Sequence, residues 1–443
     1  MPSTPDTSAS GTSRRAFCSG AATLLLAQGR LSRAAGFAAQ MPPGPPGTAT
    51  RPDVAAIDHD RVLAAAEHYL TQQPTPLTSL PCPRSLGTPH DYYSEAQPAT
   101  DTDAKANAAP PPFTAHRDAL FTLGLAAPAL AAAHLLTGEE RYAEYAAVWL
   151  RAWFIDPATR MSPSLDFGQV VPAPAPTNQF TVQTNSRSST PPAHPGGRFE
   201  GVLETLPLVE VAQAIPFLAA SLALTAGEQK ALRAWFAAYL HWLTAPQDSG
   251  PRLAALARDQ KSHHGTSWLL QACAYATFTA ADSTAPRAED NSLEPLRHQY
   301  KAVTLRAQIT ADGAFPHELP SPTPYRDSLF NLDMLALVCQ LLSTRFDNVW
   351  DYQLEDGPSM RSAIAYHFPF IAERGLWPYR ADIAHFDQLP SRRISLLLCA
   401  RAYQRPEYAA LWKTLPPDPA SPDVLRTLPV HQPLLWVRQP PRT

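Results

Sequence analysis

Apolar residues recur every three or four positions along the middle of this chain, and this period constrains the fold more than any other feature. One such stripe consists of Tyr142, Tyr145, Ala146, Trp149 and Trp153. A second stripe consists of Leu232, Trp235, Phe236, Tyr239 and Leu243. This spacing places the side chains on one face of a helix, and large apolar side chains on one face indicate a helix that packs against a core.

Helices are expected in much of the remaining sequence. The Ala/Leu-rich stretch 119–136 is followed by Gly138, a residue type that suits the end of a helix. Further helices are predicted near 53–70, 205–224, 266–280, 291–308, 329–344, 360–373 and 391–403. No convincing alternation of apolar and polar residues and no β-hairpin signal is found, so strands are not expected.

The number of helices limits how they can be arranged. Short connections between helices imply antiparallel neighbours. A single compact core rarely grows beyond about 250–300 residues. A ring or arc of helix pairs avoids that limit, because each pair packs mainly on its neighbours. The sequence therefore predicts an all-α protein, an (α/α) toroid or incomplete barrel of antiparallel helix hairpins.

The N-terminus is typical of an export signal. Arg14 and Arg15 precede Phe17, an apolar stretch follows at 21–27, and small residues gather at 34–39. This pattern predicts a twin-arginine signal and hence a periplasmic or secreted protein. Because no apolar stretch was expected to reach about 18 residues, no membrane span is predicted.

Charge and cysteine content exclude several classes of protein. The net charge is -3, which disfavours a protein that wraps nucleic acid. Beyond the signal, Cys82, Cys273, Cys339 and Cys399 show no C-x-x-C spacing, so no zinc site is suggested. Three of these four cysteines lie in apolar helical contexts and are expected to be buried thiols. We expect no cofactor, no metal and a monomeric chain.

Three long loops interrupt the predicted helices, at 71–117, 156–198 and 311–328. Loops of this length in a compact domain are usually lids, binding walls or disordered linkers. The first carries Tyr92 and Tyr93 and the third carries charged residues, a composition that suits a sugar-binding cleft. The tyrosine pair may equally well only anchor its loop, and the role of 172–197 is left open.

The candidate chemistry centres on the stretch from Lys261 to Trp268, which reads K-S-H-H-G-T-S-W. His263 and His264 adjoin each other at the start of a predicted helix, and neither is needed to build the fold. Two structural interpretations remain open: His264 may cap or pack, and His263 may be solvated. A zinc site is less favoured, since no H-E-x-x-H motif or third ligand is visible.

This stretch resembles the N-N-H-G-T-W-Y-D-x-Q segment of the alginate lyase superfamily of polysaccharide lyases. Other motifs of that family follow in the same order across roughly residues 80–410. They are H-D-Y-Y-S at 90–94, L-L-T-G-E-E-R-Y at 135–142, L-R-A-W-F at 150–154 with D-P-A-T-R-M at 156–161, the segment 197–205, and A-D-G, E-L and L-F-N-L at 311–313, 318–319 and 329–332. The resemblance implies an (α/α) toroid.

The resemblance also implies β-elimination on a uronic-acid polysaccharide. The C5 proton of a uronate is a poor acid, so the neighbouring carboxylate must be neutralised or hydrogen-bonded as negative charge develops. A base must remove that proton, and an acid must protonate the departing O4. In the family, Asn and His of the N-N-H segment serve the first two roles, and a Tyr before F-N-L serves as acid, or as acid and base.

The correspondence assigns roles to four candidate catalytic residues. His264 matches the family His and is the first candidate for base or carboxylate partner. His263 stands where the family has its second Asn, and Ser262 replaces the first. Asp327 stands at the position of the catalytic Tyr, with Tyr325 two residues before it as an alternative proton donor.

Six further residues are candidates for binding the substrate. Their side chains are aromatic, basic or amide groups in the matched motifs, which suits an acidic sugar. They are Tyr92, Tyr93, Arg198, Arg326, Trp268 and Gln271.

Two alternatives to a lyase remain open. A glycoside hydrolase on a similar toroid would need two carboxylates across a cleft, and Asp327 and Glu318 are the obvious pair. A catalytically inactive, lyase-like carbohydrate-binding protein is the second alternative, because the expected Tyr and Asn are replaced.

The expected organisation is linear. It comprises a signal peptide at 1–39, an N-terminal segment with one helix at 40–79, the lyase-like toroid at 80–420 and a C-terminal tail at 421–443.

Overall fold

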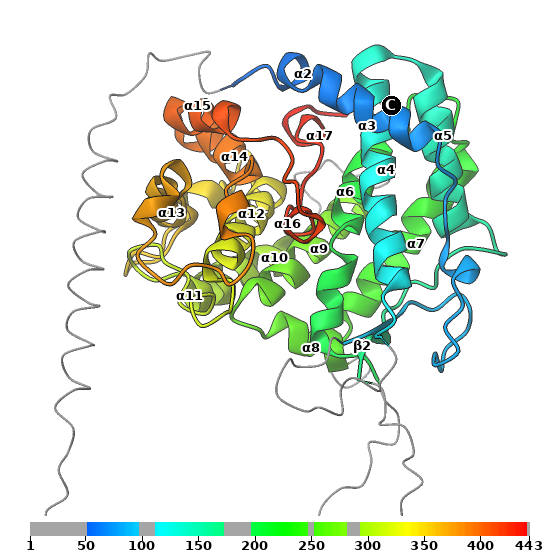
Figure 1. The fold of residues 1–443 in the computed structure, drawn as a ribbon, viewed down its shortest axis with the longest axis horizontal. Coiled ribbons are helices and arrows are strands. Elements are labelled where there is room, and N and C mark those ends of the chain that lie inside the picture. The colour runs from blue at the N-terminus through cyan, green and yellow to red at the C-terminus, as the bar shows by residue number, and fades with distance from the viewer. Residues whose placement is uncertain (1–50, 97–110, 172–195, 247–251, 281–292, 441–443) are drawn as a thin grey trace, which may run out of the picture.

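The computed structural model describes residues 51–96, 111–171, 196–246, 252–280 and 293–440. The predicted export signal and most of the segment 172–197 lie outside these residues. The described chain is an (α/α) toroid, as predicted. In Figure 1 the cyan and green helices form one half of the ring and the yellow and orange helices form the other.

The first half of the ring contains the helices up to α9. Their bounds are α2 Val54–Ile57, α3 His59–Leu70, α4 Ala115–Thr137, α5 Glu140–Leu150, α6 Leu208–Ala214, α7 Ala226–Thr244, α8 Arg252–Arg258 and α9 His263–Thr279. Two 3₁₀ turns, Phe199–Thr205 and Ile215–Leu218, flank α6, so the helix predicted near 205–224 is broken into three pieces. Helix α8 was not predicted.

The second half contains the remaining helices. They are α10 Glu294–His298, α11 Leu305–Gln308, α12 Pro324–Leu342, α13 Met360–Ala372, α14 Ile394–Tyr403, α15 Pro406–Thr414, α16 Pro422–Leu425 and α17 Leu434–Val437. A π-helical stretch, Gln299–Thr304, joins α10 to α11. The last three helices were not predicted, because each is short and lacks an extended apolar period.

Local sequence signals explain where several helices begin and end. Helix α4 ends at Gly138, whose left-handed backbone (φ 72°) a side chain would disfavour. Helix α7 begins with a capping box, in which Thr225 and Glu228 each accept a hydrogen bond from the other's backbone N–H. Such caps satisfy amide groups that the helix itself leaves unpaired.

The core runs along α9 and α12, which pack against each other. Almost every residue of both helices is buried, including polar residues such as Gln271 and Asp333. A helix that is apolar on all sides is one that neighbours cover on all sides. Three cysteines, Cys273, Cys339 and Cys399, are buried and free, as expected.

A small sheet departs from the all-helical expectation. Strands β1 (Tyr93–Glu95) and β2 (Phe167–Val170) pair in parallel. They lie in the loops predicted at 71–117 and 156–198, and each is too short for a period of two to be recognised.

The predicted third loop is shorter than expected, because α12 begins at Pro324. Proline suits the first turn of a helix, where no backbone N–H is required. The carboxylate of Asp382 accepts hydrogen bonds from the backbone N–H groups of Tyr325 and Arg326, at 2.8 and 3.0 Å. Tyr325, Arg326 and Asp327 therefore lie in the first helical turn and not in a loop.

Two apolar helical stretches, Ala115–Thr137 and Phe199–Leu218, are long enough to cross a membrane by length and composition. The expectation that no stretch reaches this length is therefore wrong. Within the structure 61% and 72% of their most apolar windows are buried. Such burial is what the core helices of a toroid require.

Contacts between the two ends of the described chain close the ring. Asp58, which precedes α3, accepts a hydrogen bond from Arg392 at 2.5 Å. Arg61 of α3 donates to the carbonyl oxygen of His431 at 3.0 Å. Figure 1 shows α16 and α17 between the two halves of the ring. We refer to residues 421–438 as the C-terminal segment.

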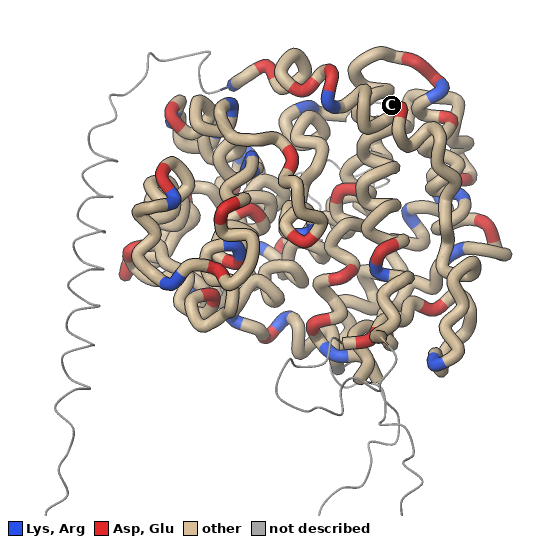
Figure 2. The backbone as a smooth tube through the Cα atoms, in the orientation of Figure 1, with Lys and Arg blue, Asp and Glu red and all other residues tan. Residues whose placement is uncertain are grey.

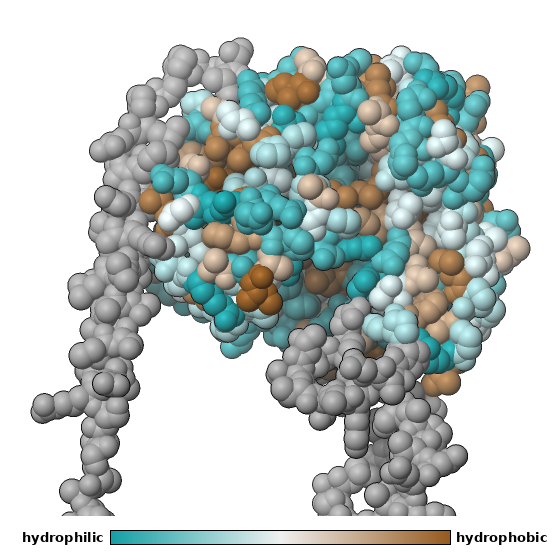
Figure 3. Space-filling view, viewed as in Figure 1, coloured by the Kyte–Doolittle hydropathy of each residue, from teal (hydrophilic) through white to brown (hydrophobic). Residues whose placement is uncertain are grey.

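Charge is distributed evenly over the described surface. Figure 2 shows acidic and basic residues interspersed along the elements. On the face shown in Figure 3, apolar residues form scattered patches within a mainly hydrophilic surface. An anionic ligand must therefore be held by a local group of basic residues, since no single-sign field covers the surface.

Candidate active site

A cavity of about 480 Å³ lies between the two halves of the ring. Helices α4, α9 and α12, the turn 199–205 and the C-terminal segment all contribute to its walls. The charged or strongly polar lining residues are Arg117, Gln169, Glu200, Glu204, Glu210, His264, Arg326, His385, Asp423, Arg426 and His431. A second cavity, of about 570 Å³, is lined by none of the predicted site residues.

A close backbone approach fixes the position of His264. The next residue is Gly265, and a Cβ there would lie 2.1 Å from the carbonyl oxygen of Gln260. Only glycine fits this contact, so the preceding loop can pack directly against the first turn of α9. This contact places the histidine pair at the beginning of the helix, where His264 faces the cavity.

The ring of His264 is neutral. Burial, together with the positive charge of His263, lowers the pKa of His264 to about 3. Its Nδ1 lies 3.3 Å from Ser262 Oγ, and its ring packs edge-on against Phe199 at 5.5 Å. A proton on Nδ1, donated to Ser262, leaves Nε2 as an acceptor.

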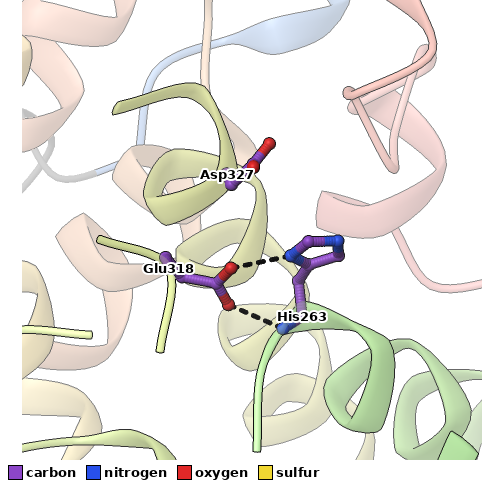
Figure 4. A group of neighbouring side chains, drawn as sticks. All are labelled: His263, Glu318 and Asp327. Atoms are coloured by element: carbon purple, nitrogen blue, oxygen red, sulfur yellow. Dashed lines mark hydrogen bonds and ion pairs between the residues drawn. The ribbon is translucent and has the colours of Figure 1, made fainter. Parts of the chain in front are cut away.

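His263 differs from its neighbour because it has a carboxylate partner. Its Nδ1 lies 2.7 Å from Glu318 Oε2, and its backbone N–H donates to Oε1 of the same carboxylate at 2.6 Å (Figure 4). Burial lowers the pKa of His263, but the hydrogen bond and charge of Glu318 and the charge of Asp327 outweigh it. The pKa is therefore raised above 6.5.

Asp327 and Arg326 form the next ion pair in the first turn of α12. Arg326 Nε lies 3.3 Å from Asp327 Oδ1, and Arg326 Nη2 donates to Thr323 Oγ1 at 2.7 Å. The other oxygen of Asp327 accepts hydrogen bonds from Ser321 and Thr323. Arg326 lines the cavity, while Asp327 is buried beside it.

His263, Glu318 and Asp327 are close enough to surround a cation. One ligand atom from each lies within 4.8 Å of the others. However, the His263 imidazolium neutralises Glu318, and the Arg326 guanidinium neutralises Asp327. An imidazolium also has no lone pair to offer a metal. We therefore interpret this group as a network of ion pairs.

Glu204 organises the opposite part of the lining. Its carboxylate accepts hydrogen bonds from Tyr92 (2.9 Å), Ser94 (2.5 Å) and Gln169 (2.6 Å). Burial outweighs these bonds and raises the pKa of Glu204. Tyr92 is thus fully buried behind the lining, where it supports Glu204, and it does not itself line the cavity.

Tyr325 does not reach the cavity. Its side chain is fully buried, and its hydroxyl donates to the carbonyl oxygen of Phe370 at 2.9 Å. Its ring packs against Trp377 and Phe386. The helical first turn of α12 directs Tyr325 into the core, so the expectation that it completes proton transfer does not fit this geometry.

Four other predicted binding residues also lie outside the lining. Trp268 donates to Leu243, and Gln271 bonds to Val202, and both are buried in the core. Tyr93 donates to Glu95. Arg198 is half-exposed and pairs with Glu200, and only its partner lines the cavity.

The structure therefore brings together only part of the predicted set. His264 and Arg326 line the cavity, and His263 and Asp327 lie directly behind them through printed contacts with the ring of His264 and with Arg326. Sequence reasoning missed Arg117, Glu204 and Arg426. The A-H-R-D start of α4 offered a weak signal for Arg117, whereas nothing local distinguishes Arg426 from a surface residue.

A family model described as alginate lyase matches residues 77–377. This chain belongs to the alginate lyase family. The matched region contains α4 to α13 and so includes His263, His264, Glu318 and Asp327. Membership of this family supports a polysaccharide lyase. The match ends before His385 and the C-terminal segment, which complete the cavity.

Solved structures of alginate lyases share this architecture. An alginate lyase from Bacteroides ovatus is 22% identical, with a TM-score of 0.65, over 91% of this chain and 97% of that chain. This similarity shows the fold. Alginate lyase A1-III from Sphingomonas species A1 is 13% identical, with a TM-score of 0.42, over 78% and 86% of the two chains. No curated protein matches the sequence.

Proposed function

We propose that this member of the alginate lyase family cleaves a uronic-acid-containing polysaccharide, alginate or a related uronan, by β-elimination. We further propose that it acts in the periplasm or outside the cell, as its N-terminal sequence predicts. The observation that carries the reaction is the histidine pair. A neutral His264 faces the cavity, and a cationic His263 lies beside it with ring centroids 4.3 Å apart.

Neutralisation of the uronate carboxylate is assigned to His263 and Arg326. Removal of the C5 proton places negative charge on the adjacent carboxylate, and positive groups in a partly buried site stabilise that charge. His263 keeps its proton because Glu318 pairs with it, and its Nε2 points away from that carboxylate (Figure 4). In the family an uncharged Asn occupies this position, so this chain uses a charge where its relatives use an amide.

Proton transfer is assigned to His264 alone. Its Nε2 takes the proton from C5, the C4–C5 double bond forms, and the C4–O4 bond breaks. The same proton then passes from Nε2 to the departing O4, so the imidazole ends as it began. A bound carboxylate raises the basicity of His264 by opposing the field of His263. One residue acting as base and then acid replaces the missing Tyr.

The geometry disfavours the glycoside hydrolase. Its two carboxylates would have to flank a glycosidic bond, about 5 Å or more apart, from two sides. Glu318 and Asp327 instead lie on the same side, within 4.8 Å of each other and of His263, and both are buried in ion pairs. Neither carboxylate lines the cavity.

Turnover of a uronan panel tests the proposal. Alginate, glucuronan and polygalacturonate are incubated with wild type and with His264→Ala, and the ultraviolet absorbance of the unsaturated product is followed. We expect turnover of at least one polymer by wild type and a loss of about 10³-fold or more in the variant. Saturated products would support the hydrolase. Binding with no turnover of any polymer would support the inactive carbohydrate-binding protein.

A further inference from the structure

A second pair of basic side chains lines the same cavity. Arg117 belongs to the first turn of α4, and Arg426 belongs to the C-terminal segment. Both approach one oxygen of Asp118: Arg426 Nη2 lies 2.7 Å from Oδ1, and Arg117 Nε lies 3.7 Å from it. Two guanidinium groups therefore share a single carboxylate oxygen.

The other acidic residues of the lining are already engaged. Glu204 is 4.0 Å from Arg117 Nη1, but Tyr92, Ser94 and Gln169 hold its oxygens.

The remaining three acids of the lining likewise have their own partners. Glu210 accepts the backbone N–H groups of His431 and Gln432, Glu200 pairs with Arg198, and Asp423 lies 3.7 Å from His385. The Arg117–Arg426 pair therefore keeps an excess of positive charge, and such an excess in a cavity attracts an anion.

The surrounding structure orients Arg426 before any ligand arrives. Its guanidinium carbon lies 4.4 Å from the centre of the Phe121 ring, over the ring face. The backbone on its C-terminal side is held at Thr427, whose carbonyl oxygen lies 3.4 Å from Arg393 Nη2. A guanidinium that is held on two sides binds a carboxylate with a smaller entropic cost than a free one.

We propose that Arg117 and Arg426 bind a second uronate carboxylate, on a sugar residue other than the one whose C5 proton His264 removes. The inference rests on the proposed function and narrows its substrate class. The cavity then prefers polymers in which successive sugars are uronates over polymers in which uronates alternate with neutral sugars. Arg426 lies outside the region that the family model matches, so this position is a feature of this chain.

Binding and turnover are measured separately to test this position. Calorimetry uses His264→Ala protein with uronate tetramers prepared from polymannuronate, polyglucuronate and polygalacturonate, and with a hyaluronan tetrasaccharide, in which uronates alternate with neutral sugars. Arg117→Ala and Arg426→Ala are added singly to this background. The matched control is Arg438→Ala, which removes the same charge from an exposed position of the C-terminal segment outside the lining.

We expect each lining variant to raise the Kd of the best polyuronate tetramer about tenfold, and the control to leave it unchanged. The hyaluronan tetrasaccharide should bind more weakly and lose less. Unfolding temperatures establish that the variants are folded, and these should change little because the ion pairs are partly exposed. Kd values within about twofold of the parent in both lining variants would overturn the inference.

Turnover by variants with His264 intact separates this inference from the proposed function. Unsaturated product with no dependence on Arg117 or Arg426 leaves the lyase and removes the second position. Arginine-dependent binding with no unsaturated product from wild type leaves the position and removes the lyase. Neither binding nor turnover of any of these polymers removes both.

Discussion

Glu318 holds His263 at two points, through Nδ1 at 2.7 Å and through the backbone N–H at 2.6 Å. The carboxylate thus fixes both the ring and the first turn of α9 with one group. The buried Glu318 also keeps the imidazole protonated, since a nearby negative charge favours the cation. This contact separates the roles of the two histidines, because His264 has no acidic partner among the described residues.

The first prediction concerns the pH profile of His263→Asn, the residue that the family has at this position. The pKa of His263 is raised above 6.5, so the cation is present below that pKa and is lost as pH rises through it. Wild-type kcat/KM should therefore fall on the alkaline side, at a pH above 6.5. The variant should lack this limb, because an amide does not titrate. His298→Asn, at an exposed position in α10, is the control, and an unchanged limb in His263→Asn would contradict the assignment.

The second prediction concerns Glu318→Gln, which keeps an acceptor and removes the charge. The pKa of His263 should fall, since burial then acts without an opposing carboxylate beside it. We expect kcat/KM at pH 7 to drop about tenfold or more for each unit of this fall, with partial recovery at lower pH. The measurement is kcat/KM from pH 5 to 9, and a uniform loss at every pH would show that the charge is not responsible.

The third prediction concerns Tyr325→Phe. The change removes a buried hydrogen bond to Phe370, so the free energy of unfolding should fall by about 1 kcal/mol. Because the hydroxyl lies outside the cavity, kcat should stay unchanged. Denaturant unfolding and turnover are measured on the same preparation. A loss of kcat of about a hundredfold would return Tyr325 to the catalytic set.

The fourth prediction concerns the buried ion pair between Arg393 and Asp333. Arg393 Nε lies 2.9 Å from Asp333 Oδ2, and both side chains are almost completely buried. Arg393→Met leaves an unpaired buried carboxylate, and we expect a loss of about 3–5 kcal/mol in the free energy of unfolding. The double variant Arg393→Met/Asp333→Asn should recover much of this loss. Additive effects in a double-mutant cycle would argue against a coupled pair.

The fifth prediction concerns Glu210, which anchors the C-terminal segment at His431 and Gln432. Burial raises the pKa of Glu210 from 4.5 to about 7, against the opposing effect of these N–H groups. Its contribution to stability is complete below pH 4.5 and is lost as pH rises through 7. The shift of roughly 2.5 units corresponds to about 3 kcal/mol.

Thermal unfolding between pH 4 and 8 checks this prediction. Glu210→Gln should remove most of the loss, while Glu144→Gln, at an exposed position in α5, should follow wild type. Parallel curves for Glu210→Gln and wild type would show that another group titrates.

The helices themselves could be predicted, because their apolar periods are local properties of the sequence. The stripe at 142–153 and the run at 119–136 correspond to α5 with the π-helical turn after it, and to α4. The start of α12 could not be predicted, since Asp382 caps Tyr325 and Arg326 from 57 and 56 residues away.

The site could be predicted only in part for the same reason. The histidine pair is visible as a local motif, and its resemblance to a known segment identified it. The placement of Tyr325 in the core depends on the helical turn that Asp382 caps. The placement of Arg426 in the cavity depends on where the C-terminal segment crosses the ring, which no local pattern encodes.

The contact between Asp58 and Arg392 joins positions separated by 334 residues, and it closes the ring beside the C-terminal segment. Bringing such distant positions together has a large entropic cost, so contacts of this kind form late when a chain folds. A molecule with its helical hairpins already made but this junction still open has no finished cavity. The last event of folding is thus also the event that creates the enzyme.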